Sequence, residues 1–286
     1  MRPSAATRTA RAFGVTLLIL WSLGPIAMGV MTSLSTAPET QQVPARWIPE
    51  DATTASYAAL LGSGKAIGSD DAAADSSQFG RAMLNTLLLT VVTTIIVIVI
   101  AVGAGYGFSR TEFRGNKPLL WIVLATMVLP IFTIVVALYK LMAELNLIDT
   151  FAGLVLVYVS SAAPLAIWLL YNYVRDLPPD PEEAALIDGC TRFGALRRVV
   201  LPQMRSGIAA LTAIVMLGVW GQFLIPLLLT STSETKPVTV IITEFIGKYT
   251  TNYPLLTAAG ILAVIPPAIV ALVLNRHIRG MLSAGG

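Results

Sequence analysis

The sequence predicts an all-α membrane protein with six transmembrane helices in a single domain, residues 1–286. Charged residues make up only 12% of the chain, whereas a soluble domain is about 25% charged. Six stretches of 22 residues or more lack Asp, Glu, Lys and Arg, and about 20 helical residues cross a hydrocarbon core of about 30 Å. The predicted spans lie at about 12–34, 82–108, 118–141, 151–174, 206–230 and 254–275.

The first span resembles a signal peptide at its start, because three arginines among the first eleven residues precede an apolar run. The apolar region of a signal peptide is about 7–15 residues long. Here the run continues over residues 13–33, so an uncleaved anchor is expected. Cleavage near Ser35 is the alternative, and it would leave a mature chain with five spans.

Basic residues predict which side of the membrane each loop faces. Six spans place both termini on one side, and that side carries thirteen Lys and Arg residues against six on the other. Short loops rich in Lys and Arg stay in the cytoplasm. Both termini and residues 110–117 and 175–205 are therefore predicted to be cytoplasmic, and residues 39–80 and 231–248 external.

Several kinds of chemistry are excluded by what the chain lacks. Cys190 is the single cysteine and His277 the single histidine, so neither a disulfide framework nor a His/Cys metal cluster is expected. Residues 62–65 (GSGK) are the nearest fragment to a phosphate-binding Walker A loop, but they lack its leading glycine and its final Ser or Thr. We therefore expect a non-catalytic chain with no catalytic residues, metal or cofactor of its own.

The cytoplasmic loop 180–202 is predicted to begin with a short helix. Asp180 is a suitable N-cap, Pro181 suits the first turn, and Glu183 lies three residues after the cap. Gly189 follows, and glycine readily takes the positive φ that ends a helix. A helix over residues 181–188 is expected.

A second, amphipathic helix is predicted over residues 192–201, with Pro202 as its stop. Two short helices joined by a glycine transmit force to a partner, which a flexible loop does not. Glu183 offers a carboxylate for a charge-assisted bond to a partner arginine, and Ala184 and Ala185 allow a close approach. The alternative is that Glu183 only completes a capping box and the alanines only favour helix.

At these residues the sequence resembles a known family. Residues 183–202 fit the signature E-A-A-x3-G-x9-I-x-L-P of binding-protein-dependent ABC importer permeases, and the match is closest to the second permease of the maltose-type carbohydrate branch. Five further segments of this sequence agree with that branch: Asn85-Thr86, 105–110 (GYGFSR), 127–130 (MVLP), 145–150 (LNLIDT) and 220–227 (WGQFLIPL). The resemblance implies that an ATPase is contacted by Glu183, Ala184, Ala185, Asp188, Gly189, Leu201 and Pro202.

The resemblance also implies a fold, a function and a set of partners. The fold is that of a type I ABC importer permease, with a cytoplasmic two-helix coupling loop. Such a chain forms half of the translocation path for a sugar or sugar-like solute across the lipid bilayer of a bacterial plasma (inner) membrane. Its partners are a second homologous permease, two cytoplasmic ATPase subunits that bind ATP and Mg, and an extracytoplasmic solute-binding protein, with no nucleic acid.

Other solutes and another transporter class are the alternatives. The same importer class also carries glycerophosphodiesters and other polar solutes. An ion-coupled secondary transporter usually keeps acidic or histidine residues inside the membrane, whereas all six predicted spans lack Asp, Glu and His. That second alternative is therefore disfavoured.

The substrate path is predicted from residue chemistry. A sugar is recognised by aromatic faces and neutral hydrogen-bonding groups, and the candidates for contact are Trp121, Trp220, Gln222 and Tyr158. Trp121 is alternatively an ordinary interfacial residue. After the fifth span, a turn is expected at residues 231–237. Residues 238–246 are expected to form either a short strand or a re-entrant helix, amphipathic and facing the binding protein.

Overall fold

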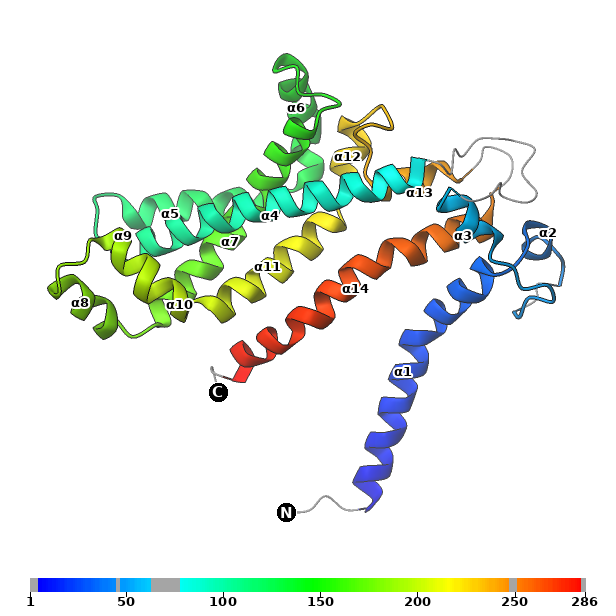
Figure 1. Cartoon of the computed structure of the whole chain (residues 1–286), viewed down its shortest axis with the longest axis horizontal. Helices are drawn as coiled ribbons and strands as arrows, with labels where there is room; N and C mark the ends of the chain where they lie inside the picture. Colours follow the sequence, from blue (N-terminus) through cyan, green and yellow to red (C-terminus); the bar gives the residue numbers. More distant parts are fainter. Residues whose placement is uncertain (1–4, 45–46, 63–77, 247–250, 284–286) are drawn as a thin grey trace. The chain divides into compact units, whose positions relative to one another are not determined.

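A computed structural model describes residues 5–44, 47–62, 78–246 and 251–283 of the chain (Figure 1). Most of residues 62–65, considered above as a nucleotide loop, lie outside the described residues. The chain divides into two compact units, and each is described by itself. One comprises residues 1–81 and 241–264, the other residues 82–240 and 265–286.

The first unit contains the N-terminal helix and the segment that follows it. Helix α1 (Ala5–Ser33) is followed by α2 (Ala37–Thr40) and α3 (Ala55–Leu60). The Ser33 hydroxyl lies 2.7 Å from the Tyr57 hydroxyl and joins the end of α1 to α3. Both the first part of α14 (Tyr253–Ser283) and the last part of α13 (Val238–Glu244) also belong to this unit.

The second unit contains the remaining helices, with α4 from Ala82 onward, and also the other parts of α13 and α14. They are α4 (Gln78–Arg110), α5 (Asn116–Ala125), the 3-10 helix η1 (Thr126–Val128), α6 (Ile131–Glu144), α7 (Phe151–Asp176), α8 (Asp180–Ile187), α9 (Arg192–Ala195), the π-helix η2 (Leu196–Val200), α10 (Leu201–Gln203), α11 (Arg205–Trp220) and α12 (Leu224–Leu229). The described part of the chain is thus all-helical, as predicted.

Across both units, four helices of the described residues are individually long and apolar enough to cross a membrane. Two bent pairs of helices raise the number to six if each pair is one span. The four are parts of α1, α4, α7 and α14. The first bent pair contains α5 and α6 and breaks at Leu129, which is extended (φ −72°, ψ 115°) because the residue before Pro130 avoids the helical region.

The fifth predicted span, residues 206–230, is not one continuous helix. Helix α11 ends at Trp220, and α12 begins at Leu224. Pro226 has no N–H to donate to the carbonyl of Gln222 four residues earlier, and the hydroxyl of Thr239 donates to that carbonyl instead, at 2.7 Å. The carbonyl of Gln222 therefore keeps a hydrogen bond at the break, and a side chain of α13 supplies that bond.

The core of the second unit is built on α4, α7 and α11. Gly105 of α4 lies so close to α7 that a Cβ there would stand 3.0 Å from the Cβ of Leu170. Gly207 of α11 similarly faces the ring of Tyr173, whose hydroxyl lies 2.7 Å from that of Ser206. Small residues at such crossings allow membrane helices to pack closely. These contacts pack both α4 and α11 closely against the last turns of α7.

Candidate coupling site

The first helix of loop 180–202 ends as predicted. Gly189 has φ +87°, the left-handed conformation that glycine adopts without strain. Its N–H bonds to the carbonyl of Leu186 at 3.1 Å, and the N–H of Cys190 bonds to that of Ala185 at 3.0 Å. This pair of bonds is a Schellman motif, which satisfies the last carbonyls of α8 and reverses the chain sharply.

The start of this helix differs from the prediction. Asp180 is the first helical residue rather than the cap, and Pro179 occupies the N-cap position with no side-chain capping bond. The expected capping box with Glu183 is therefore wrong. Asp180, Glu182 and Glu183 instead place three carboxylates in the first turn, where the helix dipole favours negative charge.

The second helix of the loop runs from Arg192 to Gln203. Thr191 caps it, because its hydroxyl accepts the N–H of Gly194 at 3.1 Å. Pro202 does not stop it at once: the helix ends one residue later and then bends by 77° into α11. The proline follows the π-helical stretch Leu196–Val200. The wider turn of a π-helix accommodates the proline ring, which has no N–H to donate to the preceding turn.

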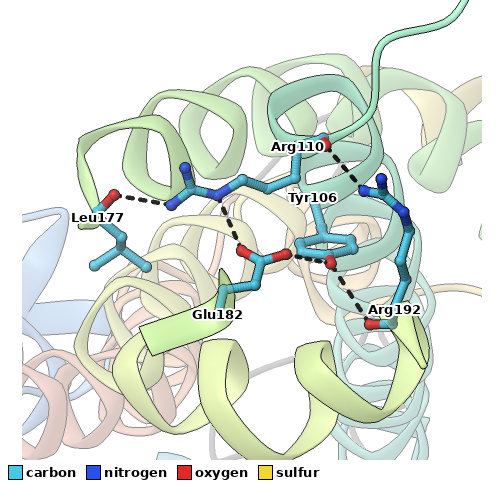
Figure 2. Close-up of polar contacts among 5 residues, drawn as sticks. All are labelled: Tyr106, Arg110, Leu177, Glu182 and Arg192. Carbon is cyan, nitrogen blue, oxygen red and sulfur yellow. Dashed lines mark hydrogen bonds and ion pairs between the residues drawn. The ribbon is translucent and has the colours of Figure 1, made fainter. Parts of the chain in front are cut away.

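A buried carboxylate anchors this loop to α4. Glu182 is 5% exposed, and its Oε1 accepts a hydrogen bond of 2.5 Å from the Tyr106 hydroxyl (Figure 2). Its Oε2 lies 3.2 Å from Nε of Arg110, one turn further along α4. One oxygen of the carboxylate therefore accepts a hydrogen bond, and the other forms an ion pair, both with residues on the last turns of α4.

The two arginines of this cluster extend it to other elements (Figure 2). Nη2 of Arg110 donates to the carbonyl of Leu177, the C-cap of α7, at 2.8 Å. Nη1 of Arg192, at the start of α9, donates to the carbonyl of Arg110, the last residue of α4, at 3.2 Å. The cluster therefore joins the ends of α4 and α7 to α8 and α9.

This cluster is a strong constraint because its ion pair between Glu182 and Arg110 is largely shielded from water. Removing one partner of a buried ion pair leaves the other charge uncompensated, which typically costs about 3–5 kcal/mol. The Arg110 side chain is 16% exposed and that of Glu182 7%. The coupling loop is thus held rigidly at the ends of two long helices.

Sequence reasoning missed Glu182 and chose its neighbour Glu183. Adjacent helical residues point about 100° apart, so two consecutive acidic residues necessarily face different surroundings. The segment 105–110 was noted, and its polar residues Tyr106 and Arg110 were the available signal for an internal acidic partner. What the sequence did not reveal is that α4 ends beside α8.

The remaining predicted coupling residues lie on the outside of the loop. Glu183, Ala184, Asp188, Gly189 and Pro202 are exposed, and Ala185 and Leu201 are half-buried. On the same loop two large apolar side chains are also exposed, Ile187 at 85% and Phe193 at 73%. This exposed set, which we call the knob surface, consists of Glu183, Ala184, Ile187 and Phe193.

Comparison with known proteins identifies the family. Residues 98–280 match the family of the binding-protein-dependent transport system inner membrane component. The chain belongs to this family. It is therefore a transmembrane permease of a binding-protein-dependent ABC transport system, and it is not the catalytic component of that system.

Several transport-system permeases resemble this one over nearly their whole length. The diacetylchitobiose uptake system permease of Streptomyces coelicolor is 31% identical, with 99% of this chain and 90% of the relative covered. The sulfoquinovosyl glycerol transport system permease of Agrobacterium fabrum is 27% identical, with 96% and 92% covered. The trehalose transport system permease of Mycobacterium tuberculosis is 29% identical, with 94% of each covered.

Solved structures agree on the fold. A chain of a bacterial ABC transporter that imports the acidic polysaccharide alginate superposes with a TM-score of 0.78 at 22% identity, covering 96% of this permease and 99% of that chain. A second structure, of an alginate transporter with its pentasaccharide-bound periplasmic protein, gives a TM-score of 0.65 at 19% identity, with 96% of each chain covered. The permease thus has the fold of an ABC importer permease, as predicted.

The predicted substrate-path residues lie on different parts of the permease. Trp121 on α5 is 71% exposed, whereas Tyr158 on α7 is buried in the core and its hydroxyl has no hydrogen-bond partner among the described residues. Trp220 is buried at the end of α11, and Gln222 is half-buried in the break that follows. Trp220 and Gln222 are therefore neighbours along the chain, whereas Trp121 and Tyr158 belong to other helices and differ in exposure.

One pocket of about 280 Å³ lies between α4 and α7, and none of these four residues lines it. Its lining is entirely apolar, so it lacks the hydrogen-bonding groups that a sugar site requires. The lining residues are Leu88, Leu89, Val92, Phe151, Ala152 and Val155.

Proposed function

We propose that this permease forms half of the translocation path of a sugar importer and that its knob surface docks onto a cytoplasmic ATPase subunit. The observation that carries the proposal is the contrast between Glu182, which is buried, hydrogen-bonded and ion-paired, and the exposed Ile187 and Phe193 on the same loop. An element with a rigid anchor and an apolar outer surface is suited to protein docking, because exposed aromatic and aliphatic anchors supply most of the binding energy at an interface.

The assembly that we infer contains a second, homologous permease, two ATPase subunits and an extracytoplasmic binding protein. Loop 180–202 and both termini then face the cytoplasm, and the whole chain, residues 1–286, acts as one permease domain. The positive-inside distribution of Lys and Arg supports this orientation. Helix α13 and the turn before it then lie on the external side, toward the binding protein.

A sugar or sugar-like solute is the substrate class that we propose. Its support is that the relatives named above transport diacetylchitobiose, trehalose and sulfoquinovosyl glycerol. Trp220 and Gln222 are the path residues that we favour, because Trp220 is the last residue of α11 and Gln222 lies in the non-helical break that follows, so an aromatic ring and an amide adjoin that break. Trp121 and Tyr158 remain weaker candidates for the same path.

The docking proposal is tested by purifying the permease gently from its native membrane and measuring how much ATPase subunit accompanies it. Phe193→Ser and Ile187→Ser remove the apolar anchors of the knob surface without touching the Glu182 cluster. Each is expected to reduce the co-purified ATPase by at least tenfold, since truncating an interface anchor typically costs about 2 kcal/mol or more. The matched control is Phe223→Ser, an exposed phenylalanine outside the loop, which is expected to retain the ATPase. Retention of the ATPase by both loop variants would contradict the proposal.

A further inference from the structure

The end of α4 opposite the coupling loop is also fixed by buried side chains. Nδ2 of Asn85 donates to the carbonyls of Glu234 and Lys236, at 2.9 and 3.1 Å. The hydroxyl of Thr86 accepts the N–H of Val238 at 2.8 Å. Asn85 is 6% exposed and Thr86 3%, so these bonds are shielded from water. They hold the segment 231–238, between α12 and α13, against α4.

A second group holds the same segment from the turn between α6 and α7. Oδ1 of Asp149 accepts the N–H groups of Ser231 and Thr232, at 3.0 and 3.2 Å, and also a hydrogen bond from the hydroxyl of Thr235. A carboxylate that accepts several such bonds acts as a cap for the turn. The segment 231–238 is therefore held in one conformation and exposes Ser231 and Thr232 at its surface.

Helix α4 is uninterrupted between these two anchored ends. It contains no proline, whereas α1, α7 and α14 each contain at least one and the two other candidate spans are bent pairs. Proline removes a backbone hydrogen bond and kinks a helix, so α4 is the candidate span in the described part of the chain that has neither a proline nor a break. From Asn85 to Arg110 it rises about 38 Å, enough to cross a hydrocarbon core of about 30 Å.

We propose that α4 is a rigid link that carries movement of segment 231–238 to the coupling loop 180–202, and the reverse. Asn85 and Thr86 form hydrogen bonds with the external segment. Tyr106 and Arg110 bind the loop through Glu182. When a continuous helix is bonded to a different segment at each end, a displacement of one segment is expected to displace the other. The inference rests on the proposed function, because that function supplies the ATPase at one end and the binding protein at the other.

Coupling of this kind is reciprocal, so nucleotide bound at the ATPase alters the external segment. The experiment uses the complete transporter, purified with its partners into lipid nanodiscs, and a non-hydrolysable ATP analogue with Mg²⁺ as the probe. Amide hydrogen exchange is measured over residues 229–240, which include the bonded N–H groups of Ser231, Thr232 and Val238. In the wild type the analogue is expected to change the exchange rate of this segment by at least about fivefold.

Variants at the two ends of α4 distinguish a link from local effects. Tyr106→Phe removes one bond to Glu182 and is expected to leave exchange of the segment unchanged without nucleotide, while reducing the nucleotide response at least threefold. Asn85→Ala is expected to raise exchange without nucleotide and to reduce the response equally. The matched control Tyr173→Phe, which removes the bond to Ser206 between α7 and α11, is expected to keep the full response.

The double variant gives the decisive comparison. Mutations far apart that act independently have additive free energies, so their fold-effects multiply. For a link through α4, Asn85→Ala with Tyr106→Phe is expected to reduce the response no further than the larger single variant. Multiplied effects, or a full response in Tyr106→Phe, would overturn the link while leaving the docking proposal intact. Absence of any ATPase subunit from the purified wild-type complex would instead contradict the proposed function, and the link with it.

Discussion

Glu182 and Arg110 lie 72 positions apart in sequence, yet Oε2 of the first is 3.2 Å from Nε of the second. The pair joins the first turn of α8 to the last turn of α4. The hydroxyl of Tyr106 donates a hydrogen bond to the other carboxylate oxygen of Glu182. Glu183, the next residue, is exposed. Two adjacent glutamates therefore have separate roles in this permease: one anchors the coupling loop, and the other belongs to its knob surface.

Glu182→Gln is expected to loosen the coupling loop strongly. The variant leaves Arg110 buried beside a neutral amide, and loss of one charge from a buried pair typically costs about 3–5 kcal/mol. Limited trypsin digestion at Arg197 and Arg198 in the purified permease measures the opening of the loop. Glu183→Gln, the matched control at the neighbouring exposed carboxylate, is expected to be cleaved at the wild-type rate. Equal protection of the two variants would show that Glu182 is no anchor.

Glu183→Ala is expected to reduce transport while leaving insertion and abundance near normal. In the isolated permease its carboxylate is exposed and has no capping role, so its loss costs little stability. In the docked state it is expected to pair with an arginine of the ATPase, whose loss typically costs about 3–5 kcal/mol. Solute uptake normalised to permease abundance in membranes measures this effect. Wild-type uptake would remove Glu183 from the docking surface.

Gly189→Val is expected to be at least as severe, for a conformational reason. Gly189 has φ +87°, and a β-branched residue strongly disfavours that region. The Schellman motif would then break, and α8 and α9 would no longer be held at a fixed angle. Gly189→Asn, which tolerates the left-handed region better, is the matched control and is expected to keep a substantial part of the uptake. Equal loss in both variants would point to contact with the ATPase rather than to backbone conformation.

Asp149→Asn is expected to destabilise the segment 231–238 at neutral pH. Burial alone would raise the pKa of Asp149, but hydrogen bonds from Thr235, Ser231 and Thr232 lower it to about 2. A depressed pKa means that the ionised form stabilises the fold above the ordinary pKa of about 3.9, and that this contribution is lost as the pH falls toward 2.

Thermal unfolding of the purified permease in detergent, followed from pH 7 to pH 3, measures this contribution. The stability difference between wild type and Asp149→Asn is expected to be constant above about pH 5 and to shrink below about pH 4. Asp188→Asn, at an exposed carboxylate of the coupling loop, is the control. A difference that grows with acidity would contradict the assignment.

Single cysteines are expected to report the membrane orientation in a Cys190→Ser background. Thr232→Cys is expected to react with a membrane-impermeant thiol reagent in intact cells, and Arg198→Cys only after the membrane is opened. Both positions are exposed in the structure, so protection at either one reports the membrane rather than packing. Labelling of Arg198→Cys but not Thr232→Cys would reverse the proposed topology. N-terminal sequencing of the same preparation tests whether the first span is retained.

The sequence by itself determined the all-helical membrane fold, the family and the glycine turn of the coupling loop. These follow from local properties: uncharged runs of sufficient length, a short signature, and a glycine where the chain needs φ +87°. The sequence predicts helix boundaries less well at proline. Whether Pro130, Pro202 or Pro226 breaks, bends or continues a helix depends on which groups bond to the backbone carbonyl that proline leaves without a donor.

Only the tertiary structure decided which polar residues meet. Glu182 and Glu183 are the same residue type in the same turn of one helix, and their surroundings differ because α4 ends beside α8 on one side. Asn85, Asp149 and the segment 231–238 lie far apart in sequence and come together because α4, α7 and α12 pack in one unit. A buried polar group requires a partner, but only packing determines which one it finds.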